Sequence, residues 1–182
     1  MKKIGLKRGT VELVKHDKNW KNAFEKEKIN IQKILGKYAK EIEHIGSTSI
    51  SRIKAKPLID ILIGVESIRK NGKNYIKKMN FANYVYRSKF GNSNHILFVK
   101  GNEESRTHYI HIVKYRGVKW NKYILFRNYL RDNFRVAKKY ENLKINLAQK
   151  FPDARNEYTK RKSEFVEQTI ALARRRKYEK AK

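Results

Sequence analysis

A short run of small and hydroxyl-bearing residues has the composition of a phosphate-binding turn. The run is Gly46-Ser47-Thr48-Ser49, and it directly follows a segment that contains Glu43 and His44. A turn of this kind after a strand can direct backbone N–H groups and hydroxyls at a phosphate, because glycine lacks the Cβ barrier and serine and threonine add donors. We therefore take Gly46, Ser47, Thr48 and Ser49 as candidate phosphate-binding residues and His44 as a further pocket residue.

One carboxylate, Asp60, lies inside the almost continuous apolar run 58–65. Such a run is typical of a strand that is covered on both faces. An unpaired carboxylate is costly in apolar surroundings, so Asp60 should pair with a base, accept hydrogen bonds or bind a cation. Two interpretations stay open on the residues alone: a buried ion pair with a lysine or arginine, and a ligand for Mg²⁺.

Two basic residues are candidates for holding a phosphate near this strand, Lys56 and Arg106. Arginine can grip a phosphate with two parallel hydrogen bonds, whereas lysine offers a point charge. The alternative role for both is an ion pair with Asp60 or Glu43.

Two histidines, His108 and His111, belong to the apolar-alternating run 107–115. Because they are three residues apart, they face opposite sides of a regular strand, so at most one can reach an ion that is bound at the turn. The alternative is that these imidazoles bond within the sheet or to phosphate oxygens. We take His111 as the candidate ligand and His108 as a further pocket residue.

The elements that must position these residues follow from periodicity. Strands are expected at 41–45, 58–65, 82–87, 95–100 and 107–115, with a helix at 20–38 that Asp17 caps, a moderately amphipathic stretch at 67–79, and helices at 120–130, 136–147 and 158–172. Strands in the middle with helices before and after predict an α+β domain, in which a small mixed sheet is flanked by helices and the C-terminal helices pack over it.

Composition bounds the class of protein. The chain has 182 residues, 45 Lys and Arg against 17 Asp and Glu, a formal charge of +28 and no cysteine. The length fits a single domain over 1–182, and the charge favours anionic partners such as a nucleotide, RNA or another polyanion. No apolar run is long enough for a membrane span and the start lacks a secretory core, so we expect a cytoplasmic protein without a membrane partner.

Five segments carry a resemblance to a known family. They are His16-Asp17-Lys18-Asn19-Trp20, the segment 42–49, the segment 55–62, the segment 106–113 and Phe126-Arg127-Asn128-Tyr129-Leu130. In this order and across nearly the whole chain, they resemble the GrpB family. The resemblance implies the fold of the nucleotidyltransferase superfamily, in which a Gly-Ser turn holds a nucleoside triphosphate and the following strand supplies metal-binding carboxylates. It does not imply a substrate.

The chain departs from the pattern of that superfamily at Leu62. Active nucleotidyltransferases usually carry a second acidic residue two positions after the first, on the same face of the strand. A two-metal mechanism needs several oxygen ligands, which Asp60 alone cannot provide. Replacement ligands would be Glu43 and His111, with Mg²⁺ or Mn²⁺ as the metal. An imidazole ligand shifts the preference from Mg²⁺ toward Mn²⁺ or Zn²⁺.

Two functions remain in view. The first is a nucleotidyltransferase of unknown acceptor, with Ser47 on the phosphates and Asp60 and Glu43 in the catalytic metal site. The second is a catalytically inactive module of the same fold that binds nucleic acid or a nucleotide through its basic surface. A hydrolase or kinase-accessory role for the same pocket is neither supported nor excluded by the residues.

Overall fold

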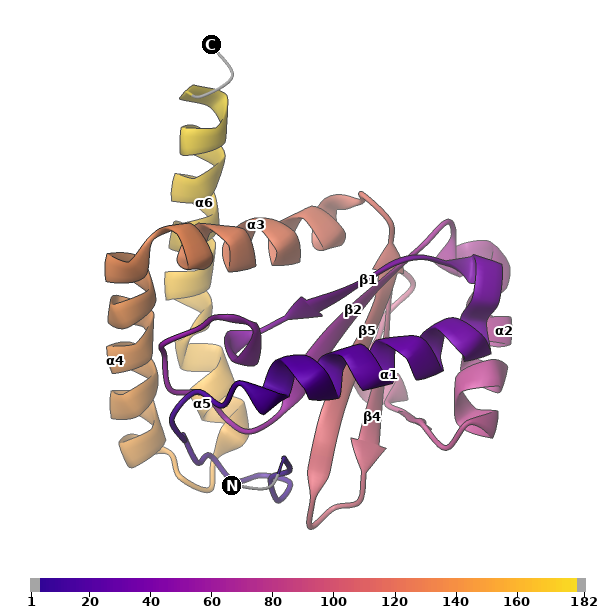
Figure 1. Ribbon diagram of the computed structural model, residues 1–182, viewed down its shortest axis with the longest axis horizontal. Coiled ribbons are helices and arrows are strands. Elements are labelled where there is room, and N and C mark those ends of the chain that lie inside the picture. Colours follow the sequence, from indigo (N-terminus) through magenta and orange to yellow (C-terminus); the bar gives the residue numbers. More distant parts are fainter. Residues whose placement is uncertain (1–3, 180–182) are drawn as a thin grey trace.

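The computed structural model describes residues 4–179, and the side chains of residues 4–176 (Figure 1). The described helices are α1 (Asn19–Leu35), α2 (Ile68–Phe81), α3 (Val118–Asp132), α4 (Phe134–Lys150), α5 (Arg155–Arg161) and α6 (Ser163–Glu179). The strands are β1 (Ala39–Ile45), β2 (Ile59–Val65), β3 (Val85–Tyr86), β4 (His95–Gly101) and β5 (Arg106–Lys114), and a short 3-10 turn, η2 (Ser47–Ser49), follows β1.

The strands form one mixed sheet in the order β1-β2-β5-β4-β3. The central pair, β2 and β5, is parallel, and the other neighbours are antiparallel. The parallel pairing needs a crossover, which α2 and the strands β3 and β4 provide. The expected α+β class with a small mixed sheet is therefore confirmed.

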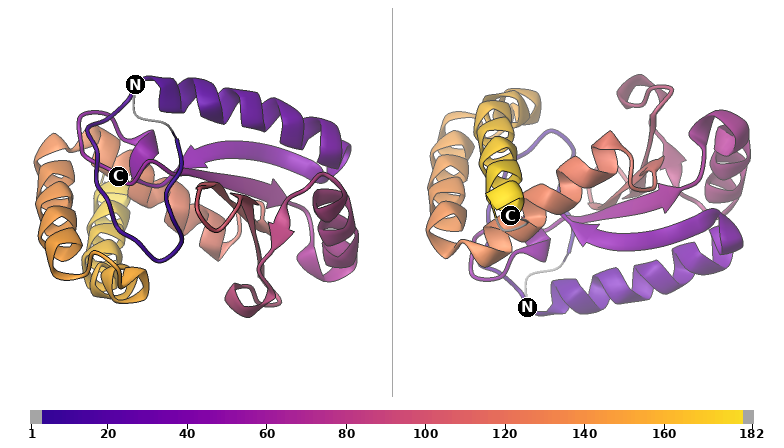
Figure 2. Two further views of the ribbon diagram at one scale, coloured as in Figure 1. Left: turned by 90° about the horizontal axis from the view of Figure 1, so that it is seen from below. Right: turned by 90° about the horizontal axis from the view of Figure 1, so that it is seen from above.

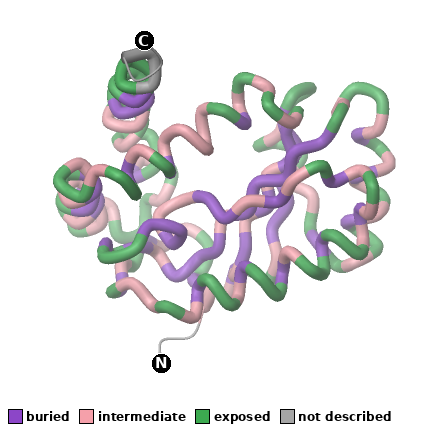
Figure 3. The backbone as a smooth tube through the Cα atoms, turned by 45° about the horizontal axis from the view of Figure 1, so that its top comes forward, coloured by how far each residue is buried: buried purple, intermediate pink, exposed green. Residues whose placement is uncertain are grey.

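Helices cover both faces of the sheet, so the central strands are buried along most of their length (Figures 2 and 3). On one face, Ile61 of β2 packs in a cluster with Trp20 of α1 and Met79 of α2. On the other face, Leu62 packs with Trp120 of α3. This alternation along β2 explains the continuous apolar run in the sequence, because both sides of the strand face helices.

The C-terminal helices cover the sheet through α3, against which α4 and α6 pack (Figure 1). The expected single helix at 158–172 is instead two helices, because the chain is interrupted at Lys162. The interruption accompanies two separate contacts: Tyr158 packs in a cluster with Leu147, and the Phe165 ring stacks on Tyr140 with centroids 5.4 Å apart.

Two further elements differ from the expectation. The strand that was expected at 82–87 is reduced to Val85–Tyr86, because the residues before it close the end of α2: Asn83 has φ +63° and the Tyr84 N–H donates to the Met79 carbonyl at 3.0 Å. The expected cap at Asp17 is displaced by one residue: the cap position of α1 is Lys18, whose side chain makes no capping bond, while Asp17 accepts a hydrogen bond from the backbone N–H of Asn19 at 2.9 Å. Among the described residues, none of the helices combines the length and the apolar character that a bilayer crossing demands.

Candidate functional site

Asp60 lies near the start of β2, on the face that α3 covers. It is opposite Ile45 of β1 and Tyr109 of β5, and its side chain is 33% exposed. Gly46 lies directly against it: a Cβ on Gly46 would be 2.3 Å from Asp60 Oδ2. Gly46 also has φ +70°, a conformation that residues with a side chain rarely adopt. The sequence therefore places a glycine where the turn and the carboxylate approach most closely.

Three cations act on this carboxylate: Lys56, Arg155 and Lys162. Burial raises the pKa of Asp60, and the positive charges of the three cations oppose that rise without cancelling it. The pKa of Lys56 is held well below its usual range, first by burial and then by repulsion from Arg155 and Lys162. Although the lowered pKa of Lys56 favours its neutral amine, Arg155 and Lys162 alone outnumber the one carboxylate and leave an excess of positive charge.

Aromatic rings hold these cations in place. Lys56 Nζ is 4.9 Å and Lys162 Nζ is 4.7 Å from the centroid of the Tyr158 ring, and the Arg155 guanidinium is 4.8 Å from that of Tyr109. None of the ion pairs within the described residues includes these three cations. An aromatic face attracts a cation without neutralising it, so the charge stays available to an anion. In addition, Arg155 Nη1 is buried without a hydrogen-bond partner.

His111 shares the face of the sheet with Asp60, and its Nε2 is 4.0 Å from Asp60 Oδ1. Its Nδ1 is 3.0 Å from His95 Nε2 and 3.5 Å from the Tyr123 hydroxyl. Burial lowers the pKa of His111 to about 3 and that of His95 to about 4, so both rings are neutral at neutral pH. As alternation along the strand predicts, His108 points away from this group; its Nδ1 contacts Thr107 Oγ1 at 2.9 Å.

Glu43 is on the same face as Asp60 but is opposite Leu62. Its carboxylate accepts a hydrogen bond from Arg127 of α3, which also donates to the carbonyl of His44 at 2.9 Å. Burial alone would raise the pKa of Glu43, but the bond and charge of Arg127 bring it below its usual value. The structure thus gives Glu43 a partner other than Asp60, and its catalytic and metal-binding roles stay predictions.

The side-chain hydroxyls of the 46–49 turn have different hydrogen-bond partners. Thr48 Oγ1 donates to the Leu58 carbonyl at 3.1 Å, and Ser49 Oγ donates to the Gly46 carbonyl at 2.7 Å. These two hydroxyls hold the turn together. Within the described chain no side-chain hydrogen bond engages Ser47, and the Ser49 N–H is used by the Gly46 carbonyl, which leaves the Ser47 hydroxyl and the earlier N–H groups of the turn as the groups able to meet a phosphate.

Arg106 and His44 lie apart from the cations around Asp60. Arg106 pairs with Glu103 and donates to the Tyr109 hydroxyl at 3.3 Å. His44 is on the α1 face of the sheet, where its ring stacks on Phe24 with centroids 4.9 Å apart. The structure therefore brings together Gly46, Lys56, Asp60 and His111 from the residues that the sequence singled out.

A resident metal would need more ligands than the described residues gather. Among them, no group of three or more histidines, aspartates and glutamates lies where it could hold an ion. Asp60, with His111 beside it, can supply one or two ligands. That donor set fits a Mg²⁺ or Mn²⁺ ion that arrives with a phosphate ligand, because Mg²⁺ is commonly bound by one or two carboxylates together with substrate phosphates.

The residues that the sequence reasoning missed come mainly from the last helices. No local pattern distinguishes Arg155 and Lys162 from the other basic residues of this chain. A signal did exist for Lys144, which comes four residues after Tyr140 on the apolar stripe of α4 and is 1% exposed. Its Nζ donates to the Lys54 carbonyl, and burial with repulsion by Lys162 lowers its pKa to about 7.

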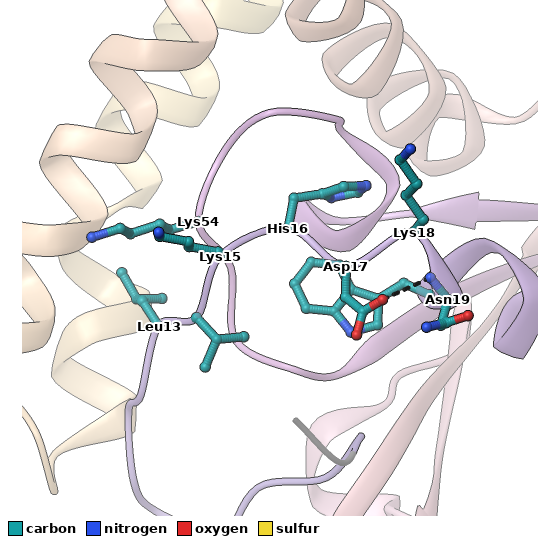
Figure 4. Close-up of a pocket in the computed structure, with 9 residues that line it drawn as sticks. Leu13, Lys15, His16, Asp17, Lys18, Asn19 and Lys54 are labelled. Atoms are coloured by element: carbon teal, nitrogen blue, oxygen red, sulfur yellow. Dashed lines mark hydrogen bonds between the residues drawn. The ribbon is translucent and has the colours of Figure 1, made fainter. Parts of the chain in front are cut away.

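Two hollows lie beside α1. The segment 13–20 and Lys54 line one of 680 Å³, in which the side chains of Lys15 and Lys54 extend to one side while Asp17 turns toward Asn19 (Figure 4). The other, of 550 Å³, is lined by residues of α1, β1, the η2 turn and α3. His16 lines both hollows.

Comparison with known proteins relates the chain to one family along most of its length. A family model described as "GrpB protein" matches residues 10–171. The crystal structure of conserved protein GrpB from Enterococcus faecalis is similar with a TM-score of 0.81 and 33% sequence identity, over 92% of this chain and 99% of that chain.

Curated relatives show the same relationship. "Glutamate-rich protein GrpB" of Alkalihalophilus pseudofirmus is 41% identical over 170 residues, which cover 92% of this chain and 98% of that protein. "UPF0157 protein YqkA" of Bacillus subtilis is 34% identical over 91% of this chain, but the match spans only 48% of that longer protein.

Proposed function

This chain belongs to the GrpB family, and from the charge arrangement around Asp60 we propose that it binds a nucleoside triphosphate there and transfers the nucleotidyl group to an acceptor. Charges and geometry rather than family names support the proposal, since the names of the relatives above state no activity.

The supporting observation is that the charges of Lys56, Arg155 and Lys162 act on one carboxylate, and that aromatic rings instead of acidic side chains hold them. A triphosphate would supply the missing negative charge, and charge-assisted hydrogen bonds to phosphate are among the stronger polar contacts in proteins. Because Gly46 has no side chain, the Asp60 carboxylate lies directly against the turn, so a group bound at the turn would also be near this carboxylate.

Mg²⁺ or Mn²⁺ that enters with the triphosphate would neutralise phosphate charge when bound. Asp60 would hold that ion, and neutral His111 lies beside it. The chain's own cations would keep the three phosphates in a fixed position. Phosphoryl-type transfer depends mainly on positioning and on charge stabilisation, which these residues are able to give.

In the proposed reaction, an oxygen of the acceptor forms a bond to the α-phosphorus. The bond from that phosphorus to the oxygen that bridges to the β-phosphorus breaks, and pyrophosphate leaves with the electron pair. The proton of the acceptor hydroxyl passes to water.

A second candidate function is binding without turnover, and Leu62 favours it. Leu62 occupies the position of the second strand carboxylate, is fully buried and packs with Trp120. On this alternative, the protein is a catalytically inactive module that binds a nucleotide or nucleic acid through its basic surface. A nucleic-acid partner would show a steep fall of affinity with salt, because several counterions are released on binding.

The test is calorimetric titration with ATP, GTP, CTP and UTP, each with Mg²⁺, with Mn²⁺ and with chelator, at moderate salt. We expect one nucleotide to bind more tightly with metal. Asp60→Asn should remove the metal-dependent part of the affinity and leave the fold intact, whereas Lys56→Met should weaken binding both with metal and with chelator. Lys160→Met, at an exposed position of the same helix as Arg155, is the matched control.

Release of pyrophosphate from the bound nucleotide separates the two candidates. A transferase releases pyrophosphate only when an acceptor is present, and a binding module does not release it. If Asp60→Asn binds the metal–nucleotide as well as the wild type does, Asp60 is a structural partner of its three cations and the proposed site is wrong.

A further inference from the structure

The 550 Å³ hollow lies on the other side of the 46–49 turn from the cations around Asp60. Gly46 contacts Asp60, whereas Thr48 and Ser49 at the end of the turn line the hollow. Its remaining walls are α1, the outer edge of β1 and α3. The volume falls in the range of about 300–1,000 Å³ that is usual for small-molecule sites. We call it the edge cavity.

Two guanidinium groups, Arg127 and Arg131, reach the edge cavity from successive turns of α3. Glu43 pairs with Arg127, and among the described residues no ion pair includes Arg131. Arg131 Nε donates to the carbonyl of Ser49 at 2.9 Å, which fixes the guanidinium over the turn and leaves its two terminal nitrogens unbonded. Arg131 therefore has no direct ion-pair partner, and the carboxylates of Glu43 and Asp132 act on it only from a distance.

The lining of the edge cavity as a whole also carries more basic than acidic side chains. Lys21, Lys28, Arg127 and Arg131 are its basic side chains, and Glu25 and Glu43 are its acidic ones. Because the basic groups come from both α1 and α3, they face the cavity from two walls. Such a concave surface concentrates positive potential and favours an anion.

His44 adds a hydrogen-bond acceptor to the same lining. Thr48 Oγ1 has one proton, which it donates to the Leu58 carbonyl at 3.1 Å, so the His44 Nε2 that lies 3.0 Å from Thr48 Oγ1 must carry the proton of that contact. The other ring nitrogen, Nδ1, is then an acceptor. Burial and the nearby Arg131 and Arg127 lower the pKa of His44 to about 3, which keeps the ring neutral.

From these contacts we propose that the edge cavity binds a small phosphate monoester that carries a free hydroxyl. Arg131 grips the phosphate with its two terminal nitrogens, and Lys28 adds charge from the opposite wall. His44 Nδ1 accepts the proton of the hydroxyl. This site is separate from the one at Asp60 and does not depend on it.

The probes are glycerol 3-phosphate and ethyl phosphate, which have the same charge but differ in hydroxyl groups. The wild type should bind glycerol 3-phosphate about fivefold more tightly, the effect of one hydrogen bond. Arg131→Gln should weaken both probes about 10- to 100-fold through loss of a charge-assisted contact. Arg135→Gln, an exposed arginine that does not line the cavity, should bind both probes as the wild type does.

The hydroxyl contact has its own test. His44→Phe keeps a ring against Phe24 and should abolish the preference for glycerol 3-phosphate without weakening ethyl phosphate. In the wild type, the ¹⁵N shifts of the His44 ring should show a proton on Nε2 and none on Nδ1. A proton on Nδ1 would refute the assignment of the acceptor.

Failure here is distinguishable from failure of the nucleotide site. Asp60→Asn and Lys56→Met should leave both probes bound as in the wild type, and a loss in those variants would place the probes at Asp60 and overturn the proposal. Equal losses in Arg131→Gln and Arg135→Gln, or no binding by the wild type, would also overturn it. If Arg131→Gln folds poorly, Lys28→Gln tests the opposite wall of the edge cavity. Unchanged binding of the probes by Lys28→Gln counts against the proposed phosphate site.

Discussion

Replacing Gly46 with alanine tests the contact that joins the 46–49 turn to Asp60. The new Cβ would be 2.3 Å from Asp60 Oδ2 and 2.9 Å from Asp60 Cγ, distances at which one group must move. Because the turn is closed by hydrogen bonds to the Gly46 carbonyl from Ser49, we expect the carboxylate to be displaced rather than the backbone.

Two costs add up in this variant. The backbone at Gly46 has φ +70° and ψ −175°, a region that is almost restricted to glycine and that costs another residue about 1–3 kcal/mol. Displacement of Asp60 toward its surroundings adds to that strain. We expect a total loss of about 2–4 kcal/mol in the free energy of unfolding. For a chain of this length, each 1 kcal/mol lowers Tm by about 2–4 °C.

Gly36→Ala is the matched control. Gly36 also has a positive φ, +55°, but nothing lies within 4 Å of its Cβ position. Gly36 has ψ −130°, again a region that favours glycine, so this variant should lose only the conformational cost of about 1–3 kcal/mol and should bind a nucleotide with metal as the wild type does. Urea denaturation measures the stability, and calorimetric titration measures binding. If both variants behave alike in both assays, the approach of Gly46 to Asp60 has no functional meaning.

Two further predictions concern buried charges. The pKa of Lys144 is about 7 in the folded state and 10.5 ordinarily, so between these values the unfolded chain binds more protons than the folded chain does. The free energy of unfolding should therefore rise with pH, by at most about 1.4 kcal/mol per pH unit. Lys144→Met should flatten that rise in urea denaturation at pH 7, 8 and 9, and an unchanged slope would contradict the prediction. Arg127→Met leaves the carboxylate of Glu43, which is 26% exposed, without its cation, and should cost about 2 kcal/mol in the same assay, more than Glu43→Gln costs. A larger loss in Glu43→Gln would contradict this expectation and would mean that the more buried guanidinium of Arg127, which is 9% exposed, is the charge that most needs its partner.

Much of the fold could be predicted, because it depends on local patterns. The apolar run at 58–65 indicates a strand covered on both faces, and the helical spacing over 120–130 and 136–147 locates two of the last helices. The break at Lys162 was missed, since the apolar spacing continues from Tyr158 to Phe165 and only the separate partners of those two rings show that the helix stops.

The part of the candidate site that comes from the first half of the chain could be predicted from the sequence. Gly46, Lys56 and Asp60 are near one another in sequence, and the strand that follows the turn returns beside it. Alternation also placed His111 correctly relative to His108. Arg155 and Lys162 could not be found, because their position depends on how the C-terminal helices pack and because basic residues are abundant throughout a chain with a charge of +28.

Two of the cations that act on Asp60, Arg155 and Lys162, come from α5 and from the break between α5 and α6, so the order in which parts of the chain fold determines when the site is complete. Lys56 and Asp60 belong to the first half of the chain, whereas Arg155 begins α5 and donates its backbone N–H to the carbonyl of Gly9 at 3.1 Å, which links α5 to the N-terminal segment. During synthesis, β2 can gain its parallel neighbour as soon as β5 has been made, but Asp60 meets Arg155 and Lys162 only after the last helices dock. We therefore expect anion binding at Asp60 to appear as a late kinetic phase in refolding, after the sheet has formed.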